Sequence, residues 1–467
     1  MPQSNRRTFL KLAAATAVAA NNPISWASTS TQARAWATSR DRRLQEINLP
    51  PWRKASGKGT LGIQIDPSAR YQEILGFGAA FTDASCYLLS ELTAEKRQAV
   101  LADLLGPDGL RLSVGRTCIG ASDYARYPYS FDDSTDPDPE LQKFSIEHDR
   151  EYIVPMLKEA QKFNQELFLF SSPWSPPGWM KANGSMLGGS MRKKYLSAYS
   201  QYFVKFLQSY SAEGVKIRAV TTQNEIDTDQ DGRMPAALWG QEYEIDFIKN
   251  HLGPALERAS LDTKIWILDH NYNLWGRVMD ELGDAAFAKY VDGVAWHGYV
   301  GKPEAMARVQ EAFPAINNYW TEGGPDYKNA DYATDWAKWS HTFTGILRNW
   351  ARCIVGWNMV LDEQGRPNIG PFSCGGLVTL DSKTHEVKPS GQYWAFAHYS
   401  KLVQRGAHVI GSQGTLADVD HVAFENPDGS RVLVITNQGA EQKVEFAEGT
   451  RTMELTLESG SITTLHW

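Results

Sequence analysis

The stretch "IRAVTTQNE" (residues 217–225) runs from β-branched and apolar residues straight into an amide and a carboxylate, Asn224 and Glu225. A short apolar run followed by polar residues is typical of a buried β-strand that ends at a loop. Seven further runs of this kind recur at long spacing, at residues 74–83, 110–116, 166–174, 264–271, 293–299, 317–324 and 353–360. Together they predict eight strands of one sheet.

The segments between these runs have the pattern of helices. "EYIVPMLKEAQKFN" and "LSAYSQYFVKFLQSYSAEG" carry apolar residues three and four positions apart, and the second stretch ends at Gly214. Continuous apolar strands that alternate with helices form a parallel sheet covered on both faces. Because eight such strands close a (β/α)8 barrel, we predict an α/β fold with a TIM barrel over residues 73–399.

The two ends of the chain have a different pattern. Residues 422–467 alternate apolar and polar side chains in short runs, with a turn at Pro427-Asp428-Gly429. Two N-terminal stretches, "ARAWATSRDRRLQEI" and "GTLGIQIDPSARYQEI", also have the pattern of strands. We therefore predict that residues 28–72 and residues 400–467 together build one β-sandwich domain beside the barrel.

The first 27 residues have the features of an export signal. Arg6 and Arg7 precede a short apolar stretch over residues 12–20, and small residues at Ser25 and Ala27 suit a signal peptidase. This stretch is too short to span a bilayer, and no later stretch is apolar for 18 residues. The sequence therefore predicts a twin-arginine signal and a periplasmic or extracellular protein without a transmembrane segment.

Composition excludes some classes of partner. A net charge of −7 over 467 residues provides no basic patch for nucleic acid. The 16 Trp and 19 Tyr slightly favour a carbohydrate site, because aromatic faces stack on the apolar faces of sugars. The four cysteines have no CxxC spacing, which argues against a zinc site. We expect all four to be buried free thiols, with one disulfide bond as the alternative.

Polar side chains gather where the predicted strands end, and the carboxyl ends of the strands form the active face of such barrels. Glu225 and Glu322 end the fourth and seventh strands. Hydrolysis of a glycosidic bond needs two such carboxyl groups, about 5–5.5 Å apart for retention and about 6.5–9.5 Å apart for inversion. The two groups also need opposite protonation states at one pH. The alternative is that both glutamates form structural salt bridges.

Two motifs extend this argument to a family. "TTQNE" and "YWTEGG" resemble the acid/base and nucleophile strands of glycoside hydrolase family 30, which includes the glucosylceramidases. The similarity covers about residue 35 to the end of the chain. It implies retaining hydrolysis of a β-glycosidic bond without a cofactor or a metal. Six further stretches agree in order with the family: "GFGAAFTDAS", "LRLSVGRTCIGASDYARYPYSFDD", "SSPWSPPGWMKANG", "AWHGY", "VGWNMVLDEQGRPN" and "SGQYWAFAHYSKLV".

The resemblance assigns roles to individual residues. Glu225 would be the acid/base, Asn224 would bind the sugar 2-hydroxyl, and Glu322 would be the nucleophile. Arg116 and Tyr299 would lie close to Glu322 and keep it ionised. The residues that would line or support the pocket for the terminal sugar are Asp83, Asp123, Trp174, Trp357 and His297. Core packing of the tryptophans, capping or ion pairing of the aspartates, and a backbone-bonded histidine stay open as alternatives.

Two departures from the family pattern bear on the substrate. Ile226 follows the acid/base where many members have proline, and "IGPFSCGGLVTL" after "GRPN" lacks an asparagine that contacts the aglycone in glucosylceramidases. We expect a β-glucosidase of the glucosylceramidase type that acts on a glucoside, oligosaccharide or glycolipid. The alternatives are an endo-β-1,6-glucanase or a xylan-active hydrolase of the same family, and a non-catalytic carbohydrate-binding protein.

The stretch "DTDQDG" (residues 227–232) resembles the start of an EF-hand calcium loop. The twelfth position of such a loop, which supplies a bidentate carboxylate, is Leu238 here. We therefore expect no calcium site. The three aspartates of this stretch are predicted to lie at the rim of the cleft, where their charge would help to hold a proton on Glu225. A metal-dependent hydrolase is not expected either, since no ligand cluster has suitable spacing.

Overall fold

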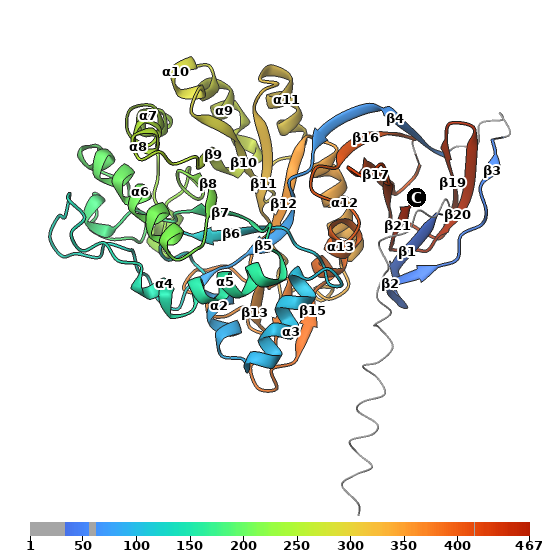
Figure 1. Ribbon diagram of the computed structural model, residues 1–467, viewed down its shortest axis with the longest axis horizontal. Helices are drawn as coiled ribbons and strands as arrows, with labels where there is room; N and C mark the ends of the chain where they lie inside the picture. Colours follow the sequence, from blue (N-terminus) through green and yellow to red (C-terminus); the bar gives the residue numbers. More distant parts are fainter. Residues whose placement is uncertain (1–32, 56–61, 415) are drawn as a thin grey trace, which may run out of the picture. The chain divides into compact units, whose positions relative to one another are not determined.

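The computed structural model describes residues 33–55, 62–414 and 416–467 (Figure 1). Residues 33–467 form one compact unit. The predicted twin-arginine signal, residues 1–27, lies outside the described residues. Within the described part of the chain, no helix combines the length and the apolar character needed to cross a membrane.

Eight parallel strands close into a barrel in the order in which they follow one another along the chain, and the last pairs with the first. Each coincides with one of the eight apolar runs, which confirms the predicted (β/α)8 barrel. The strands β5 and β6 are buried along their whole length, as expected for a sheet that is covered on both faces. The barrel strands are β5 (Gly76–Ala80), β6 (Val114–Cys118), β7 (Phe168–Ser172), β8 (Ile217–Thr221), β9 (Lys264–Asn271), β10 (Val291–His297), β11 (Asn317–Glu322) and β12 (Ala351–Gly356).

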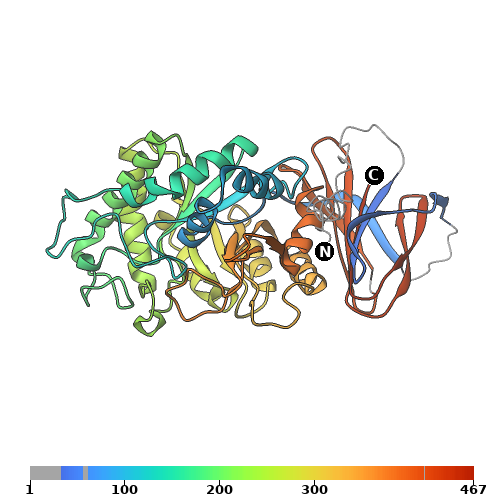
Figure 2. The same cartoon turned by 90° about the horizontal axis from the view of Figure 1, so that it is seen from below.

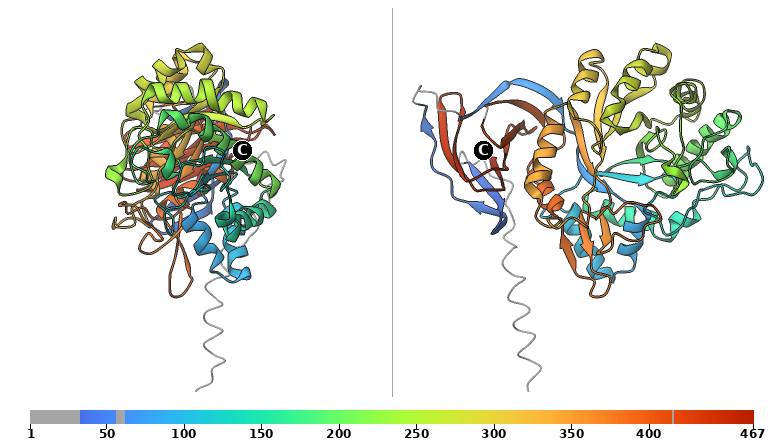
Figure 3. Two further views of the ribbon diagram at one scale, coloured as in Figure 1. Left: turned by 90° about the vertical axis from the view of Figure 1, so that its left-hand side faces the viewer. Right: turned by 180° about the vertical axis from the view of Figure 1, so that it is seen from behind.

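Helices connect these strands and surround the barrel, as Figure 3 shows for the green and yellow helices. The two segments with predicted helical pattern form α5 and α6, and Gly214 follows α6 with a φ of +81°, a backbone conformation that favours glycine. The α-helices are α2 (Asp83–Ser90), α3 (Ala94–Leu105), α4 (Glu147–Glu151), α5 (Ile153–Phe163), α6 (Leu196–Ala212), α7 (Gln241–Asp246), α8 (Gly253–Arg258), α9 (Trp275–Leu282), α10 (Ala285–Ala288), α11 (Glu304–Ala312), α12 (Trp336–Leu347) and α13 (Gly391–Ser400).

Strands from both ends of the chain share a second sheet, ordered β2-β1-β21-β18-β17-β16-β4-β19-β20-β3. Figure 2 shows the blue N-terminal strands among the red C-terminal ones. Its core contains Ile63, Ile435, Phe446, Leu455 and Leu465. The strands are β1 (Arg34–Ser39), β2 (Arg42–Ile47), β3 (Arg53–Lys54), β4 (Gly62–Glu73), β16 (His408–Gln413), β17 (Val419–Glu425), β18 (Arg431–Asn437), β19 (Gln442–Glu448), β20 (Arg451–Leu457) and β21 (Ser461–His466).

Along the chain, a small third sheet follows the last barrel strand and precedes α13. It consists of β13 (Val360–Asp362), β14 (Val378–Leu380) and β15 (Val387–Pro389). The sequence did not predict these three strands, because their apolar runs are too short. The long loop between β13 and β14 brings Phe372 and Cys374 to the carboxyl end of the barrel, where both contribute to the cavity described next.

Candidate active site

Glu225 and Glu322 reach the same cavity from two barrel strands. Glu322 is the last residue of β11, and Glu225 follows β8 after a short polar stretch. The backbone of Glu225 has a φ of +52°, and its N–H donates to the carbonyl of Asp269 over 2.9 Å. A positive φ at a residue other than glycine is uncommon and is held here by that bond to the neighbouring strand. The local backbone therefore fixes the direction in which Glu225 leaves the barrel.

The cavity at the carboxyl end of the barrel has a volume of about 400 Å³. Both glutamates line it, together with five other residues for which the sequence predicted contact with the sugar or with Glu322. Those five are Asp123, Trp174, Asn224, Tyr299 and Trp357. Seven further residues, which were not predicted as pocket residues, also line it: Thr228, Gln230, Met234, His270, Asn271, Phe372 and Cys374.

Glu322 is held by a cation and a phenol. Arg116 donates from Nη1 to Oε2 of Glu322, and Tyr299 donates from its hydroxyl to Oε1 over 3.0 Å. Arg116 is fully buried beneath the cavity and also donates to Oδ1 of Asn224 over 2.8 Å. Burial raises the pKa of Glu322, and the nearby charge of Glu225 adds to this, while His297 and Arg116 act in the opposite direction. Both predicted neighbours of Glu322 therefore contact it.

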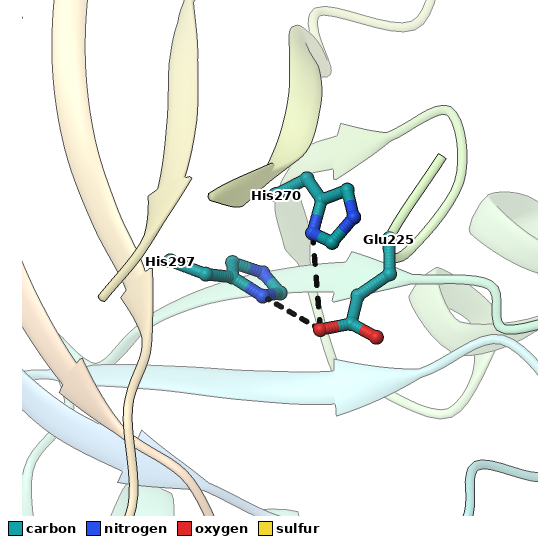
Figure 4. A group of neighbouring side chains, drawn as sticks. All are labelled: Glu225, His270 and His297. Atoms are coloured by element: carbon teal, nitrogen blue, oxygen red, sulfur yellow. Dashed lines mark ion pairs between the residues drawn. The ribbon is translucent and has the colours of Figure 1, made fainter. Parts of the chain in front are cut away.

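Glu225 has different neighbours. Gln230 donates to its Oε2 over 2.7 Å, while His297 and His270 approach its Oε1 with Nδ1 atoms at 3.5 Å and 3.8 Å (Figure 4). Burial opposes ionisation of Glu225, but His297, His270 and Gln230 together lower its pKa. We expected the aspartates of the 227–232 stretch to help hold a proton on Glu225. The structure instead surrounds this carboxylate with groups that favour its charged form.

His297 connects the two glutamates. Its Nδ1 lies 3.5 Å from Oε1 of Glu225 and 3.8 Å from Oε1 of Glu322. The two carboxylate oxygens can therefore be no farther apart than these two distances together, which is close enough for both groups to act on one glycosidic bond. Burial lowers the pKa of His297, but Glu322, Asp269 and Glu225 outweigh it and raise the pKa to about 9. At neutral pH, one proton is therefore held on Nδ1 between the two glutamates.

A buried aspartate, Asp269, organises the floor of the cavity. It accepts hydrogen bonds of 2.8 Å from Arg116 and 2.9 Å from His297, and these partners hold its pKa well below the ordinary value despite burial. Ionised Asp269 thereby fixes Arg116 and His297, which both lie against Glu322. Three hydroxyl groups from neighbouring strands complete its shell: Ser172 at 2.7 Å, Thr221 at 2.7 Å and Thr321 at 2.8 Å.

Aromatic rings and a free carboxylate oxygen suit this cavity to a sugar. Trp174 and Trp357 stack with ring centroids 5.0 Å apart and an interplanar angle of 17°. Buried Asp123 also lines the cavity, and among the described residues its Oδ1 has no hydrogen-bond partner. A buried carboxyl oxygen of this kind is suited to a hydrogen bond with a sugar hydroxyl group.

Comparison with known proteins identifies the family. A family model described as the glycosyl hydrolase family 30 TIM-barrel domain matches residues 74–403. A second model, described as the glycosyl hydrolase family 30 beta sandwich domain, matches residues 406–465. The chain belongs to glycosyl hydrolase family 30. It is therefore an O-glycosyl hydrolase that acts on carbohydrate substrates, and the interpretation as a non-catalytic binding protein is excluded.

Individual relatives in family 30 differ in their named activities. The chain is 35% identical to the endo-1,6-beta-D-glucanase of Neurospora crassa over 436 residues, covering 87% of this chain and 88% of the relative. It is 32% identical to the putative glucosylceramidase 1 of Caenorhabditis elegans over 438 residues, covering 87% and 83%. The solved structure of the endo-beta1,6-glucanase BT3312 superposes with a TM-score of 0.84 at 29% identity, covering 93% of this chain and 98% of that one.

Two predicted pocket residues are absent from the lining of the cavity: His297, which lies against both glutamates, and Asp83. Asp83 is the first residue of α2, and the lining of the cavity in this family 30 chain does not include it. Its carboxylate accepts hydrogen bonds from the hydroxyl of Tyr152 and, over 2.9 Å, from the backbone N–H of Arg126. His148 lies 2.7 Å away on the same side. Asp83 therefore has a structural role through hydrogen bonds to neighbouring residues, and its predicted contact with the sugar is corrected.

The unpredicted residues of the cavity fall into two groups. His270 and Asn271 end β9, and the sequence showed them at a strand end without assigning a role to them. Phe372 and Cys374 come from a long loop for which strand periodicity gives no signal. Cys374 is partly exposed, and the other three cysteines are buried free thiols. The expectation of buried free thiols is therefore confirmed for three of the four cysteines, and Cys374 is free but not fully buried.

The spacing of histidine, cysteine and acidic residues along the sequence did not predict a metal-binding cluster. Within the described ranges, one such group is found, and it consists of Glu225, His270 and His297. These residues come from three different strands or strand ends, so their separation along the chain hides their proximity. None of the aspartates at 227, 229 and 231 belongs to this group.

Proposed function

We propose that this hydrolase cleaves β-1,6-glucan within the chain and retains the anomeric configuration. Two family 30 proteins similar to it, one by sequence and one by structure, carry the name endo-β-1,6-glucanase. The sequence alone led us to put a glucosylceramidase-type enzyme first, and the comparisons favour the alternative. The observation that carries the mechanism is the common approach of Glu225 and Glu322 to one cavity and to one nitrogen of His297.

The first chemical step requires ionised Glu322 and protonated Glu225. In the resting state, His297 carries a proton on Nδ1 and both glutamates are ionised. The reactive state, with neutral His297 and protonated Glu225, contains the same number of protons. Transfer of this single proton over the 3.5 Å between His297 and Glu225 therefore gives the reactive state. Glu322 then attacks the anomeric carbon, the glycosidic C–O bond breaks, and the leaving oxygen takes the proton of Glu225.

The second step reverses the role of Glu225. As a carboxylate it removes a proton from a water molecule, whose oxygen attacks the anomeric carbon and breaks its bond to Glu322. Arg116 and Tyr299 receive the charge that returns to Glu322 through the hydrogen bonds that they already make with it. The sugar leaves with the β configuration that it had in the glucan.

A panel of purified polysaccharides tests the substrate. We expect β-1,6-glucan to be cut into oligosaccharides of intermediate length, measured by chromatography of the early products, and we expect β-1,3-glucan and xylan to be left intact. The Glu322→Gln variant serves as the control for contaminating hydrolases. Release of glucose alone from the start, or preference for xylan, would contradict the proposal.

A glucosylceramide-like lipid is the second candidate substrate. Two large apolar side chains at the cavity are exposed, Tyr299 by 46% and Phe372 by 42%, and they provide apolar surface for an aglycone. A relative that is 32% identical is named a putative glucosylceramidase. Hydrolysis of glucosylceramide in detergent micelles at a kcat/KM above that for β-1,6-glucan would favour this candidate.

We also propose that the enzyme is exported by a twin-arginine signal, on the basis of Arg6, Arg7 and the apolar stretch that follows them. Changing both arginines to lysine in the full chain tests this. We expect glucanase activity to move from the periplasmic or culture fraction to the cytoplasmic fraction while the total amount of protein stays similar. Unchanged fractionation would contradict export by this signal.

A further inference from the structure

Two histidines face one oxygen of Glu225. His270 comes from β9 and His297 from the end of β10, and their Nδ1 atoms lie 3.8 Å and 3.5 Å from Oε1 of Glu225. One possible ligand atom of each residue lies within 4.8 Å of those of the other two. Figure 4 shows both imidazole rings turned with a nitrogen toward this oxygen. The three side chains therefore surround one small volume at the edge of the cavity.

Both nitrogen atoms belong to buried side chains, and a metal ion can bind that of His297 once its proton has left. His297 is fully buried and His270 is 8% exposed. Among the described residues, neither Nδ1 has a hydrogen-bond partner, and Glu225 approaches them only at the longer distances given above. Buried polar atoms usually have a partner, so two such nitrogen atoms that point at one carboxylate oxygen are an exception that calls for a physical cause.

The donor set matches that of a zinc site. Two histidines and one glutamate, with a fourth position open to solvent, form a known set of three protein ligands for Zn²⁺. Metal–ligand bonds of about 2.0–2.1 Å in tetrahedral geometry place the donors about 3.3 Å apart. The separations of 3.5 Å and 3.8 Å exceed this by about half an ångström or less. His297 also donates from Nε2 to Asp269 over 2.9 Å, a carboxylate contact typical of metal-bound histidine.

The local charge favours a divalent cation. Three carboxylates, those of Glu225, Glu322 and Asp269, contact His297 at 3.5 Å, 3.8 Å and 2.9 Å. Arg116 contacts two of them and supplies one positive charge in return. With neutral histidines, these groups leave an excess of negative charge in a buried site, which a metal ion neutralises.

We propose that Glu225, His270 and His297 form a binding site for a divalent transition-metal ion such as Zn²⁺, and that a metal ion bound there inhibits the hydrolase. On binding, the ion replaces the proton on Nδ1 of His297, and that proton passes to solvent. The ion also occupies Oε1 of Glu225. Inhibition follows because Glu225 then can neither donate nor accept the proton of the reaction, and this part rests on the acid/base role proposed above.

Direct binding tests the site without reference to activity. The full enzyme is freed of metal with a chelator and titrated with ZnCl₂ by calorimetry and with CoCl₂ by visible absorption. We expect one equivalent of Zn²⁺ to bind and Co²⁺ to show the intense d–d bands of a tetrahedral site. Crystals soaked in ZnCl₂ should show an anomalous peak between Glu225, His270 and His297. Failure to bind one equivalent, or a peak elsewhere, would overturn the proposal.

Variants assign the binding to these residues. We expect His270→Gln and Glu225→Gln each to weaken the affinity for Zn²⁺ about 100-fold, with melting temperatures that confirm the fold. Two controls should keep the wild-type affinity: Cys374→Ser, which removes the thiol of the cavity, and His341→Gln, which removes an exposed histidine on α12. Wild-type affinity in His270→Gln, or loss of binding in Cys374→Ser, would contradict the assignment.

Activity measurements separate the proposed inhibition by metal from the proposed acid/base role of Glu225. We expect Zn²⁺ to inhibit hydrolysis of β-1,6-glucan with an inhibition constant equal to the calorimetric Kd, and we expect a chelator to restore the rate. Binding at the three residues without inhibition would overturn the inhibitory role and the acid/base role of Glu225 together. Absence of binding in an enzyme that Glu225→Gln inactivates would overturn the metal site alone and leave the proposed function standing.

Discussion

At the scale of single residues, the two glutamates differ in what surrounds them. Arg116 and Tyr299 contact Glu322, whereas a glutamine and two histidines surround Glu225. A nucleophile needs partners that can take up charge as it attacks and leaves, and an acid/base needs a neighbour that exchanges a proton with it. The neighbours of the two carboxylates therefore agree with the roles that we propose for them.

Amide substitutions test these roles. Glu322→Gln is expected to abolish turnover of β-1,6-glucan, because the amide cannot attack the anomeric carbon. Glu225→Gln is expected to lower kcat on the glucan by about 10²- to 10⁴-fold, the usual contribution of general acid–base catalysis. An aryl glucoside with a good leaving group needs little protonation, so the first step with Glu225→Gln should be largely spared. The measurement is steady-state and burst kinetics on both substrates, and near wild-type rates in both variants would contradict the roles.

Some residues of this site were predicted from the sequence, and others were not. Glu225, Asn224 and Glu322 were predicted because each ends a strand of a barrel and stands in a family motif. The pairing of Asp83 with His148 was missed because the two are far apart in sequence, and only the fold brings them to 2.7 Å. His270 was visible at a strand end, but nothing in the sequence indicates that its ring turns toward Glu225.

At the scale of elements, Asp269 ties neighbouring barrel strands together. Its carboxylate accepts hydrogen bonds from residues of β6, β7, β8, β10 and β11. The backbone there is unusual, since both Leu268 and Asp269 have positive φ values, 71° and 45°. A single buried charge at the end of β9 thus sets the positions of Arg116 and His297 under the cavity.

Replacement of this carboxylate by its amide tests the claim. Asp269→Asn keeps the shape but leaves Arg116 and His297 without their charged partner, and breaking such a buried pair costs about 3–5 kcal/mol. We expect a clear loss of stability in urea unfolding and a fall in kcat that exceeds any rise in KM, because the substrate itself does not contact Asp269. The control is Asp262→Asn, which breaks an exposed pair with Lys216 at 2.9 Å and should change little. A wild-type kcat in Asp269→Asn would contradict its positioning role.

The elements themselves were largely predictable. Continuous apolar runs such as 264–271 stand out because a barrel strand is buried on both faces. The strands β13, β14 and β15 were missed because each has only three residues, too few for periodicity to be measured. The loop between β13 and β14 carries Phe372 and Cys374 into the cavity, and its path depends on packing that no local pattern encodes.

At the scale of the whole molecule, the barrel and the second sheet meet through buried polar contacts. His398 of α13 lies 2.8 Å from the hydroxyl of Thr464 on β21 and 2.8 Å from the hydroxyl of Thr38 on β1. The alternating pattern of both chain ends predicted that they share a domain, and the pairing of β1 with β21 agrees with this. The sequence could not indicate that a histidine of the barrel bridges them.

Burial of His398 predicts a pH-dependent stability. Burial lowers the pKa of His398 to about 3, below the ordinary histidine value of about 6.5 that applies in the unfolded chain. The contribution of neutral His398 is therefore complete above pH 6.5 and is lost as the pH falls from 6.5 toward 3, because only the unfolded chain takes up the proton. Between pH 7 and pH 5 this loss amounts to about 2 kcal/mol.

Urea unfolding at these two pH values measures the effect. We expect His398→Gln to lose less stability than the wild type when the pH falls from 7 to 5, whatever its stability at pH 7. The matched control, His341→Gln, removes an exposed histidine on α12 and should keep the wild-type pH dependence. Equal pH dependence in wild type and His398→Gln would show that this residue is not the source.

We propose that Glu225 and Glu322 together carry out a retaining double displacement on β-1,6-glucan. The most direct test follows the digestion by ¹H NMR and records which anomer of the new reducing end accumulates first. We predict the β anomer first, with the α anomer rising later as the products mutarotate. Initial accumulation of the α anomer, or no new reducing end from β-1,6-glucan, would contradict it.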